Sequence, residues 1–191
     1  MPADAVEPAS EEPGAWGLGG LLPRGRAAAA TAVGAVATAA ASLAVHGLGA
    51  HGLVGVVLCP ALVLLTAIDL EHRLLPNAVI VPATALILLI VLVADPRRAV
   101  SHLVAGAVFA AVLLVIALIA PGGLGMGDVK LAGMIGVALG WHTVQAVLVT
   151  SLASVALGLL LLIREGRSAL RRTIPYGPFL ALGAMVAYFA S

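Results

Sequence analysis

Two aspartates stand at the ends of apolar stretches, where a carboxylate has a high energetic cost. Asp69 ends an apolar run that begins near Gly52, and Asp128 lies in the glycine-rich stretch 122–130, between the apolar runs 99–120 and 131–140. An ionisable side chain at a membrane boundary is a functional candidate by default. Glycines beside Asp128 permit sharp bends and the close approach of a helix or a substrate backbone. We therefore take Asp69 and Asp128 as candidate catalytic residues.

Two carboxyl groups at one depth, on separate helix ends, can meet over a shared water molecule. Like charges a few ångströms apart resist simultaneous ionisation, so one group keeps its proton while the other loses it. The ionised group can then act as general base on water. The protonated group can polarise a peptide carbonyl and later protonate the leaving amine, as in aspartic proteases. The five histidines lie in different segments without the helical spacing of many zinc sites, and we expect no metal or cofactor.

Each candidate residue also has a purely structural interpretation. Asp69 could simply end its helix, and Asp128 could be the N-cap of the next one, a position that favours aspartate. Lys130 could lay its stem along apolar surface with its ammonium group in water, or it could orient a carboxylate or phosphate group. Pro76 and Asn77 most simply begin a new helix.

The composition excludes a soluble globular protein. Of the 191 residues, 62% are hydrophobic and 10% are charged, and the mean hydropathy is +1.15. Soluble domains carry about 25% charged residues, so one core could not hide this apolar surface. The sequence predicts an all-α, multi-spanning membrane helix bundle in a lipid bilayer. The net charge of +1 and the lack of a basic patch with aromatic residues give no indication of nucleic-acid binding.

Hydrophobic segments divide the chain into about seven predicted membrane crossings. Acidic residues and prolines predict a disordered tail over residues 1–25, followed by one transmembrane domain over 26–191. The fifth segment has only 12 residues, whereas a crossing helix needs about 17 to 25. The predicted segments are 27–45, 52–68, 78–94, 99–120, 129–140, 143–163 and 176–190.

The distribution of basic residues favours a full crossing by the fifth segment. With seven crossings, eight basic residues share one side and two face the other, whereas a re-entrant fifth segment divides them four to six. The positive-inside rule prefers the more biased arrangement, with the N-terminus in the cytoplasm. Both aspartates then lie at the cytoplasmic face. The eight are Arg24, Arg26, Arg73, Lys130, Arg164, Arg167, Arg171 and Arg172, and the two are Arg97 and Arg98.

Three motifs resemble those of type IV prepilin peptidases. Asp69 followed by Leu75-Pro76-Asn77 resembles their first motif, and Gly125-Met126-Gly127-Asp128-Val129-Lys130 resembles their second, Gly-x-Gly-Asp-x-Lys. The stretch 174–180, Ile-Pro-Tyr-Gly-Pro-Phe-Leu, is similar to their C-terminal signature, with tyrosine in place of the commoner phenylalanine. The resemblance implies an intramembrane aspartyl endopeptidase of the inner or plasma membrane that removes leaders from prepilin-like membrane proteins. It implies that Asp69 and Asp128 are catalytic, with Gly125, Gly127, Lys130, Pro76 and Asn77 in supporting or substrate-binding positions.

The cysteine content separates this chain from the longer members of that family. Those members carry a zinc domain with paired Cys-x-x-Cys motifs that is associated with methylation, whereas this sequence has one cysteine, Cys59. The chain therefore resembles the short, peptidase-only forms that serve Tad/Flp pilins, pseudopilins or archaellin-like substrates. Two other classes remain open at this point. The aspartates could be relay acids of a proton-coupled transporter, or the chain could be a non-catalytic membrane assembly factor.

Overall fold

The structure, a computed structural model, describes residue 18 and residues 20–119, 124–166 and 175–191. These residues form seven α-helices, one turn of 3-10 helix and no strand. The prediction of an all-α helix bundle is confirmed. The predicted disordered tail lies mostly outside the described residues. The helices are α1 (Arg26–His46), α2 (Ala50–His72), α3 (Asn77–Ala94), α4 (Pro96–Ile119), α5 (Met126–Leu139), the 3-10 turn η1 (Gly140–His142), α6 (Thr143–Glu165) and α7 (Gly177–Phe189).

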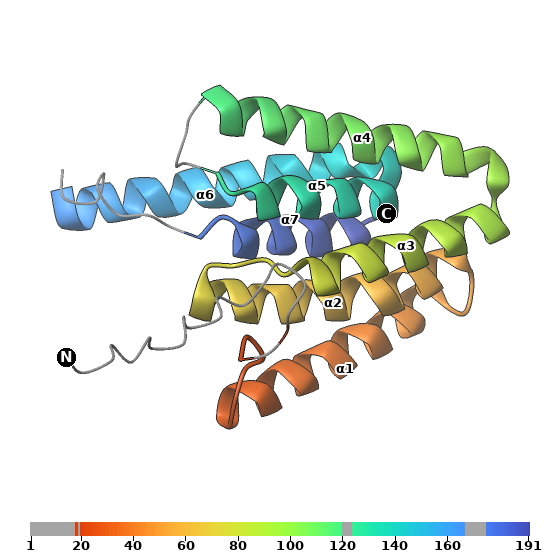
Figure 1. Ribbon diagram of the computed structural model, residues 1–191, viewed down its shortest axis with the longest axis horizontal. Helices are drawn as coiled ribbons and strands as arrows, with labels where there is room; N and C mark the ends of the chain where they lie inside the picture. The colour runs from red at the N-terminus through yellow and green to blue at the C-terminus, as the bar shows by residue number, and fades with distance from the viewer. Residues whose placement is uncertain (1–17, 19, 120–123, 167–174) are drawn as a thin grey trace, which may run out of the picture.

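Successive helices run back and forth along the long axis of the bundle (Figure 1). The ends of α2, α4 and α6 and the starts of α1, α3, α5 and α7 gather at one end. We call this the aspartate end, because it holds Asp69 and Asp128. The opposite end, where α1, α3, α5 and α7 finish, is called the far end. Two helices whose aspartates are far apart in sequence are thus brought to the same depth.

Within the part of the chain that the structure describes, five helical stretches are long and apolar enough to cross a membrane. They are α1, α2, α3, α4 and the continuous stretch Met126–Glu165, which contains α5, η1 and α6. Figure 1 shows that α5 and α6 run in opposite directions. With 14 residues, α5 is shorter than a typical crossing of about 20 residues. Nevertheless its residue Ala138 shares a far-end cavity with the start of α2, so α5 extends from one end of the bundle to the other.

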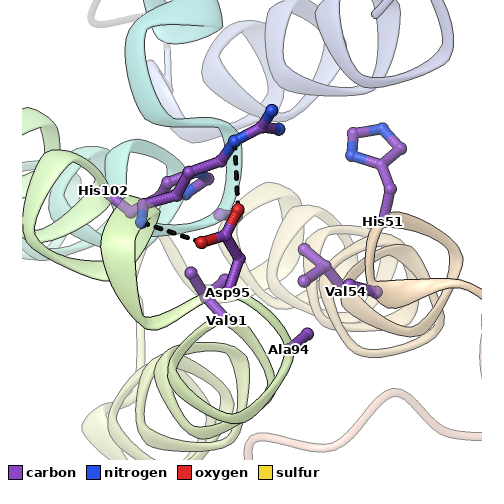
Figure 2. A pocket seen from close by; sticks show the side chains of 9 residues that line it. His51, Val54, Val91, Ala94, Asp95 and His102 are labelled. Carbon is purple, nitrogen blue, oxygen red and sulfur yellow. Dashed lines mark hydrogen bonds and ion pairs between the residues drawn. The ribbon is translucent and has the colours of Figure 1, made fainter.

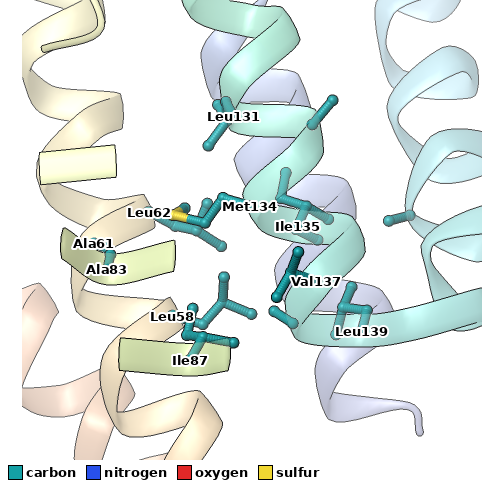
Figure 3. Packing of buried hydrophobic residues seen from close by; sticks show 14 of the residues in the cluster. Leu58, Ala61, Leu62, Ala83, Ile87, Leu131, Met134, Ile135, Val137 and Leu139 are labelled. Atoms are coloured by element: carbon teal, nitrogen blue, oxygen red, sulfur yellow. The ribbon is translucent and has the colours of Figure 1, made fainter. Parts of the chain in front are cut away.

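The short helix α5 is the centre of the bundle. Ten of its 14 residues are buried, and Leu131, Met134 and Ile135 are at most 1% exposed. Figure 3 shows Met134 beside Leu62 of α2, in the hydrophobic cluster to which Leu131, Ile135 and Ile87 of α3 also belong. A helix that is apolar around its whole circumference is expected to be surrounded by other helices rather than to lie at a surface. This position holds the start of α5, with Asp128, firmly beside α2.

Glycines bring α4 and α5 into backbone contact. A methyl group added to Gly136 would lie 2.5 Å from the Cα atom of Gly106, and one added to Gly106 would lie 2.6 Å from Val137 Cγ2. Such close approach is typical of membrane helices, which associate through van der Waals packing between small residues. Gly136 and Gly106 are therefore packing glycines.

A buried polar network ties α7 to α1 and α2 at the far end. The Tyr188 hydroxyl donates to the His51 carbonyl at 3.0 Å and lies 2.6 Å from Ser42 Oγ, which also bonds the Gly52 carbonyl at 2.9 Å. Tyr188 and Ser42 are fully buried. Since buried polar groups are costly when unpaired, this network determines how the last helix docks on the first two.

We expect Tyr188→Phe to destabilise the bundle by about 1 to 3 kcal/mol, because it removes the buried hydroxyl that bonds both Ser42 and the His51 carbonyl. The measurement is thermal unfolding of the purified protein in detergent. Thr31→Val is the matched control, since it removes a hydroxyl whose hydrogen bond to the Ala27 carbonyl is exposed. Equal unfolding temperatures for the two variants would contradict the role given to this network.

Candidate active site

Asp69 lies in the last turn of α2, with its side chain turned into the bundle. The interpretation that Asp69 ends its helix was wrong, because α2 continues to His72. Leucine, glutamate and histidine are compatible with a helix, so the break comes later, at Arg73, whose left-handed φ of 54° ends it. The Arg73 N–H closes the turn on the Asp69 carbonyl at 2.9 Å. The side chain of Asp69 is only 6% exposed.

Asp128 lies in the first turn of α5, at the third helical position. Its carboxylate Oδ2 accepts the N–H of Gly125 at 3.1 Å, as the third residue of a capping box does. The interpretation of Asp128 as the N-cap was wrong, since Gly125 occupies that position and the helix already begins at Met126. Of the predicted glycine-rich stretch, residues 122 and 123 lie outside the described residues. Asp128 is 9% exposed.

The start of α7 closes the site from a third direction. The backbone amide of Gly177 faces the Asp69 carboxylate. A methyl group added to Gly177 would lie 2.6 Å from Asp69 Oδ2 and 3.1 Å from its Cγ, so only glycine allows this approach. Tyr176, just before the helix, is partly buried, and burial together with the nearby charge of Asp128 raises the pKa of its phenol above the ordinary value.

The two carboxyl groups are close enough to interact electrostatically. Both are buried, and Asp69 Oδ2 has no hydrogen-bond partner among the described residues. The charge of Arg73 also acts on Asp69. Neighbouring carboxyl groups with little contact to water resist simultaneous ionisation. The arrangement is therefore suited to general acid–base chemistry, with one carboxyl group as proton donor and one as acceptor.

The predicted supporting residues join the two aspartate-bearing elements. The Lys130 ammonium group donates to Asn77 Oδ1 at 2.9 Å, which links α5 to the start of α3. A methyl group added to Gly127 would lie 2.7 Å from Leu75 Cβ, so the first turn of α5 packs directly on the connection between α2 and α3. Pro76 is the N-cap of α3. The structure thus brings together residues that are about 50 positions apart in the sequence.

Three residues of this region were absent from the predicted site. Leu75 contacts Gly127, Gly177 contacts Asp69, and Tyr176 lies near the charge of Asp128. The C-terminal stretch 174–180 was singled out as a signature, but nothing in its sequence indicated which aspartate it would face. That proximity depends on how α7 packs between α2 and α5.

A polar cavity lies at the far end, away from Asp69 and Asp128. It measures about 380 Å³ and is bounded by the starts of α2 and α4, the end of α3 and Ala138 (Figure 2). The Arg98 guanidinium pairs with Asp95 at 3.2 Å, and His102 Nδ1 lies 2.8 Å from the Val137 carbonyl. Asp95 and Arg98 pair with each other within the α3–α4 turn, and His102 holds α4 to α5. We assign this cavity a structural role.

Comparison with known proteins agrees with the motif resemblance. The model of the type IV leader peptidase family matches residues 56–163. A protein of Burkholderia pseudomallei (strain K96243) named "Prepilin leader peptidase/N-methyltransferase" is 36% identical over 138 residues, which cover 69% of this chain and 44% of that protein. Proteins of the same name from Bacillus subtilis (strain 168) and Stutzerimonas stutzeri are 30% and 32% identical; the matches cover 70% and 66% of this chain and 54% and 45% of those proteins.

The chain spans about half the length of the curated relatives that it matches. No solved structure matches it significantly.

Proposed function

The chain belongs to the type IV leader peptidase family, and from that premise we propose that it is an intramembrane aspartyl endopeptidase. It removes the leader peptide from type IV prepilin-like precursors, namely Tad/Flp pilins, pseudopilins or archaellin-like proteins. The observation that carries the proposal is the burial of two carboxyl groups, Asp69 and Asp128, at the same end of the bundle, close enough for their charges to interact and with Asp69 against the start of α7. The N-methyltransferase activity in the relatives' names is not part of this proposal.

The proposed reaction uses the two carboxyl groups as one acid–base unit. The ionised carboxylate takes a proton from water, whose oxygen attacks the scissile carbonyl carbon, while the protonated carboxyl gives its proton to the carbonyl oxygen. The resulting gem-diol returns one hydroxyl proton to the carboxylate that had lost its own. The other carboxyl protonates the amide nitrogen as the C–N bond breaks. A carboxylic acid and an amine leave, and the pair is restored to its starting state.

Charge supports placing the aspartate end at the cytoplasmic face of the plasma membrane. Among the described residues, the basic side chains of the connections and helix ends gather at the aspartate end, and two face the far end. This bias agrees with the positive-inside rule. The groups compared are Arg24, Arg26, Arg73, Lys130 and Arg164 at the aspartate end, and Arg97 and Arg98 at the far end. Arg167, Arg171 and Arg172 lie outside the described residues.

Reporter fusions test this orientation. A reporter fused after Arg172 should read cytoplasmic, and one fused after Ser191 should read external, because α7 runs from the aspartate end to the far end. Phosphatase and fluorescent-protein reporters give opposite signals on the two sides and control for expression. A cytoplasmic signal after Ser191 would contradict the proposed orientation.

The activity itself is tested by co-expressing the chain with a prepilin-like precursor and identifying the mature N-terminus by mass spectrometry. The expected result is a new N-terminus at the junction between the leader and the apolar helix of the precursor. A proton-coupled transporter, the alternative use of the two aspartates, is not favoured by the family membership. It would leave the precursor intact.

Lys130 and Asn77 should act on the reaction as a pair. We expect Lys130→Ala and Asn77→Ala each to slow precursor cleavage about fivefold. This factor corresponds to the loss of one hydrogen bond that contributes about 1 kcal/mol. The double variant should be no slower than either single variant, because both remove the same contact. Initial cleavage rates in membranes, normalised to enzyme amount, give the comparison. Losses that multiply would show that the two residues act independently.

A further inference from the structure

A groove on the side of the bundle leads away from the aspartate end. It lies between α3 and α4, has a volume of about 510 Å³, and has α5 as its floor. In Figure 1, α3 and α4 meet at the far end and diverge toward the aspartate end, with α5 between them. The floor extends from Lys130 to Val137, a distance of about 10 Å at a rise of 1.5 Å per residue. It is long enough for two turns of another helix.

The walls of the groove accept only a partner whose own polar groups are already paired. Nearly all lining side chains are apolar, and the hydroxyl of Thr84 already donates to the Ile80 carbonyl at 2.7 Å. Among the lining residues, Lys130 alone carries a charge, and it lies at the aspartate end of the groove. An extended peptide would have no partners here for its N–H and C=O groups. An α-helix satisfies these groups internally, as every segment exposed to lipid must.

Small side chains allow a helix to approach closely. Ala85 of α3 and Ala107 of α4 line the groove, and both are exposed. Gly133 lies in the floor, where an added methyl group would meet Ala110 Cβ at 3.5 Å and the Gly106 carbonyl oxygen at 3.8 Å, both ordinary contacts. The packing of α4 on α5 therefore does not require glycine at 133, in contrast to Gly106. Small residues in such positions favour contact with another helix.

The aspartate end of the groove lies near the depth of Asp128 in the bundle, since two residues of α5 rise only about 3 Å. Lys130 lies two residues after Asp128, and its ammonium group bonds Asn77 at the start of α3. A helix that fills the groove would therefore end near the depth of the two carboxyl groups. The chain segment that precedes this helix would then cross the site between α2, α5 and α7.

We propose that this groove binds the apolar helix of the precursor that follows the cleavage site. The bound helix sets the position of the scissile bond beside Asp69 and Asp128. This inference rests on the proposed peptidase function, and it adds where the substrate binds.

Filling the groove tests the inference through reaction rates. Ala85→Leu and Ala107→Leu each place a larger side chain in the groove, and neither touches the buried core because both alanines are exposed. Each should slow cleavage of the full-length precursor about tenfold. The matched control is Ala156→Leu, at an exposed alanine of α6 that does not line the groove, and it should cleave at the wild-type rate. Membrane levels and thermal unfolding temperatures confirm that the variants fold.

Photocrosslinking tests occupancy directly, even where a leucine variant fails to accumulate. A photoreactive amino acid at position 107, in an Asp128→Asn protein that retains the precursor, should crosslink to the apolar segment after the cleavage site. The same probe at position 156 should not. Crosslinks from 107 only to lipid, or only to a second copy of this chain, would overturn the inference.

The two proposals can fail separately. If the wild-type protein leaves the precursor intact, the proposed function fails. If the wild-type protein cleaves it and both leucine variants match the wild-type rate, the peptidase assignment stands and the groove is not the binding site.

Discussion

Asp69→Asn and Asp128→Asn should each abolish precursor cleavage while the protein still inserts and accumulates in the membrane. Each substitution keeps the size of the side chain and removes its ability to ionise. Both side chains are buried at the aspartate end, where the proposed reaction needs one carboxylate and one carboxylic acid. An amide can fill neither role. The measurement is conversion of precursor to mature protein, normalised to enzyme level.

The same two variants separate catalysis from a structural role. The side-chain oxygen of asparagine can accept the Gly125 N–H as that of Asp128 does, and asparagine has nearly the size of aspartate, so a purely structural aspartate would tolerate the change. The double variant should be little worse than either single variant, because residues that act as one unit are strongly non-additive. If either asparagine variant cleaves near the wild-type rate, the assignment of the pair is wrong.

Gly177→Ala should lower the rate of cleavage about 100-fold, although residue 177 carries no reactive group. The added methyl group would lie 2.6 Å from Asp69 Oδ2, a distance that forces either the carboxylate or the start of α7 to move. A displacement of about 1 Å in a catalytic arrangement can cost about 100-fold in rate. Initial rates and unfolding temperatures should be measured on the same preparations, since the expected loss concerns position rather than stability.

Gly158→Ala is the matched control for this prediction. Gly158 lies within α6, and a methyl group added there would meet nothing within 4 Å. The Gly158→Ala protein should therefore cleave at the wild-type rate, because the added methyl group displaces nothing and alanine favours a helix more than glycine does. A Gly177→Ala protein that is as active as Gly158→Ala would show that α7 does not position Asp69.

Helix type and helix number could be predicted from the sequence because they depend on local properties. A run of apolar residues must pair its own backbone groups when it enters a bilayer, and a helix does so wherever the run is long enough. Seven apolar segments therefore became seven helices. The predicted helix ends were less accurate. The polarity pattern placed Asp69 and Asp128 just outside the helical segments, whereas both lie inside helices. Hydropathy indicates where a membrane segment stops, whereas hydrogen bonding determines where its helix stops.

The candidate aspartates could also be identified from the sequence, because a carboxylate beside an apolar run is costly and needs a reason. The resemblance to prepilin peptidase motifs implied that Pro76, Asn77 and Lys130 support the same site. The bond from Lys130 to Asn77 was not predictable, because it depends on the angle at which α5 meets α3.

Only the tertiary structure decided what surrounds the two carboxyl groups. Sequence alone left α5 as the weakest membrane segment, yet in the structure it is the buried centre to which α2, α3, α4 and α7 are packed. The approach of Gly177 to Asp69 and the groove beside Lys130 both follow from that central position. These features depend on contacts between residues far apart along the chain. Such contacts are determined by the shapes of the packed side chains, whereas composition and periodicity determine the helices that carry them.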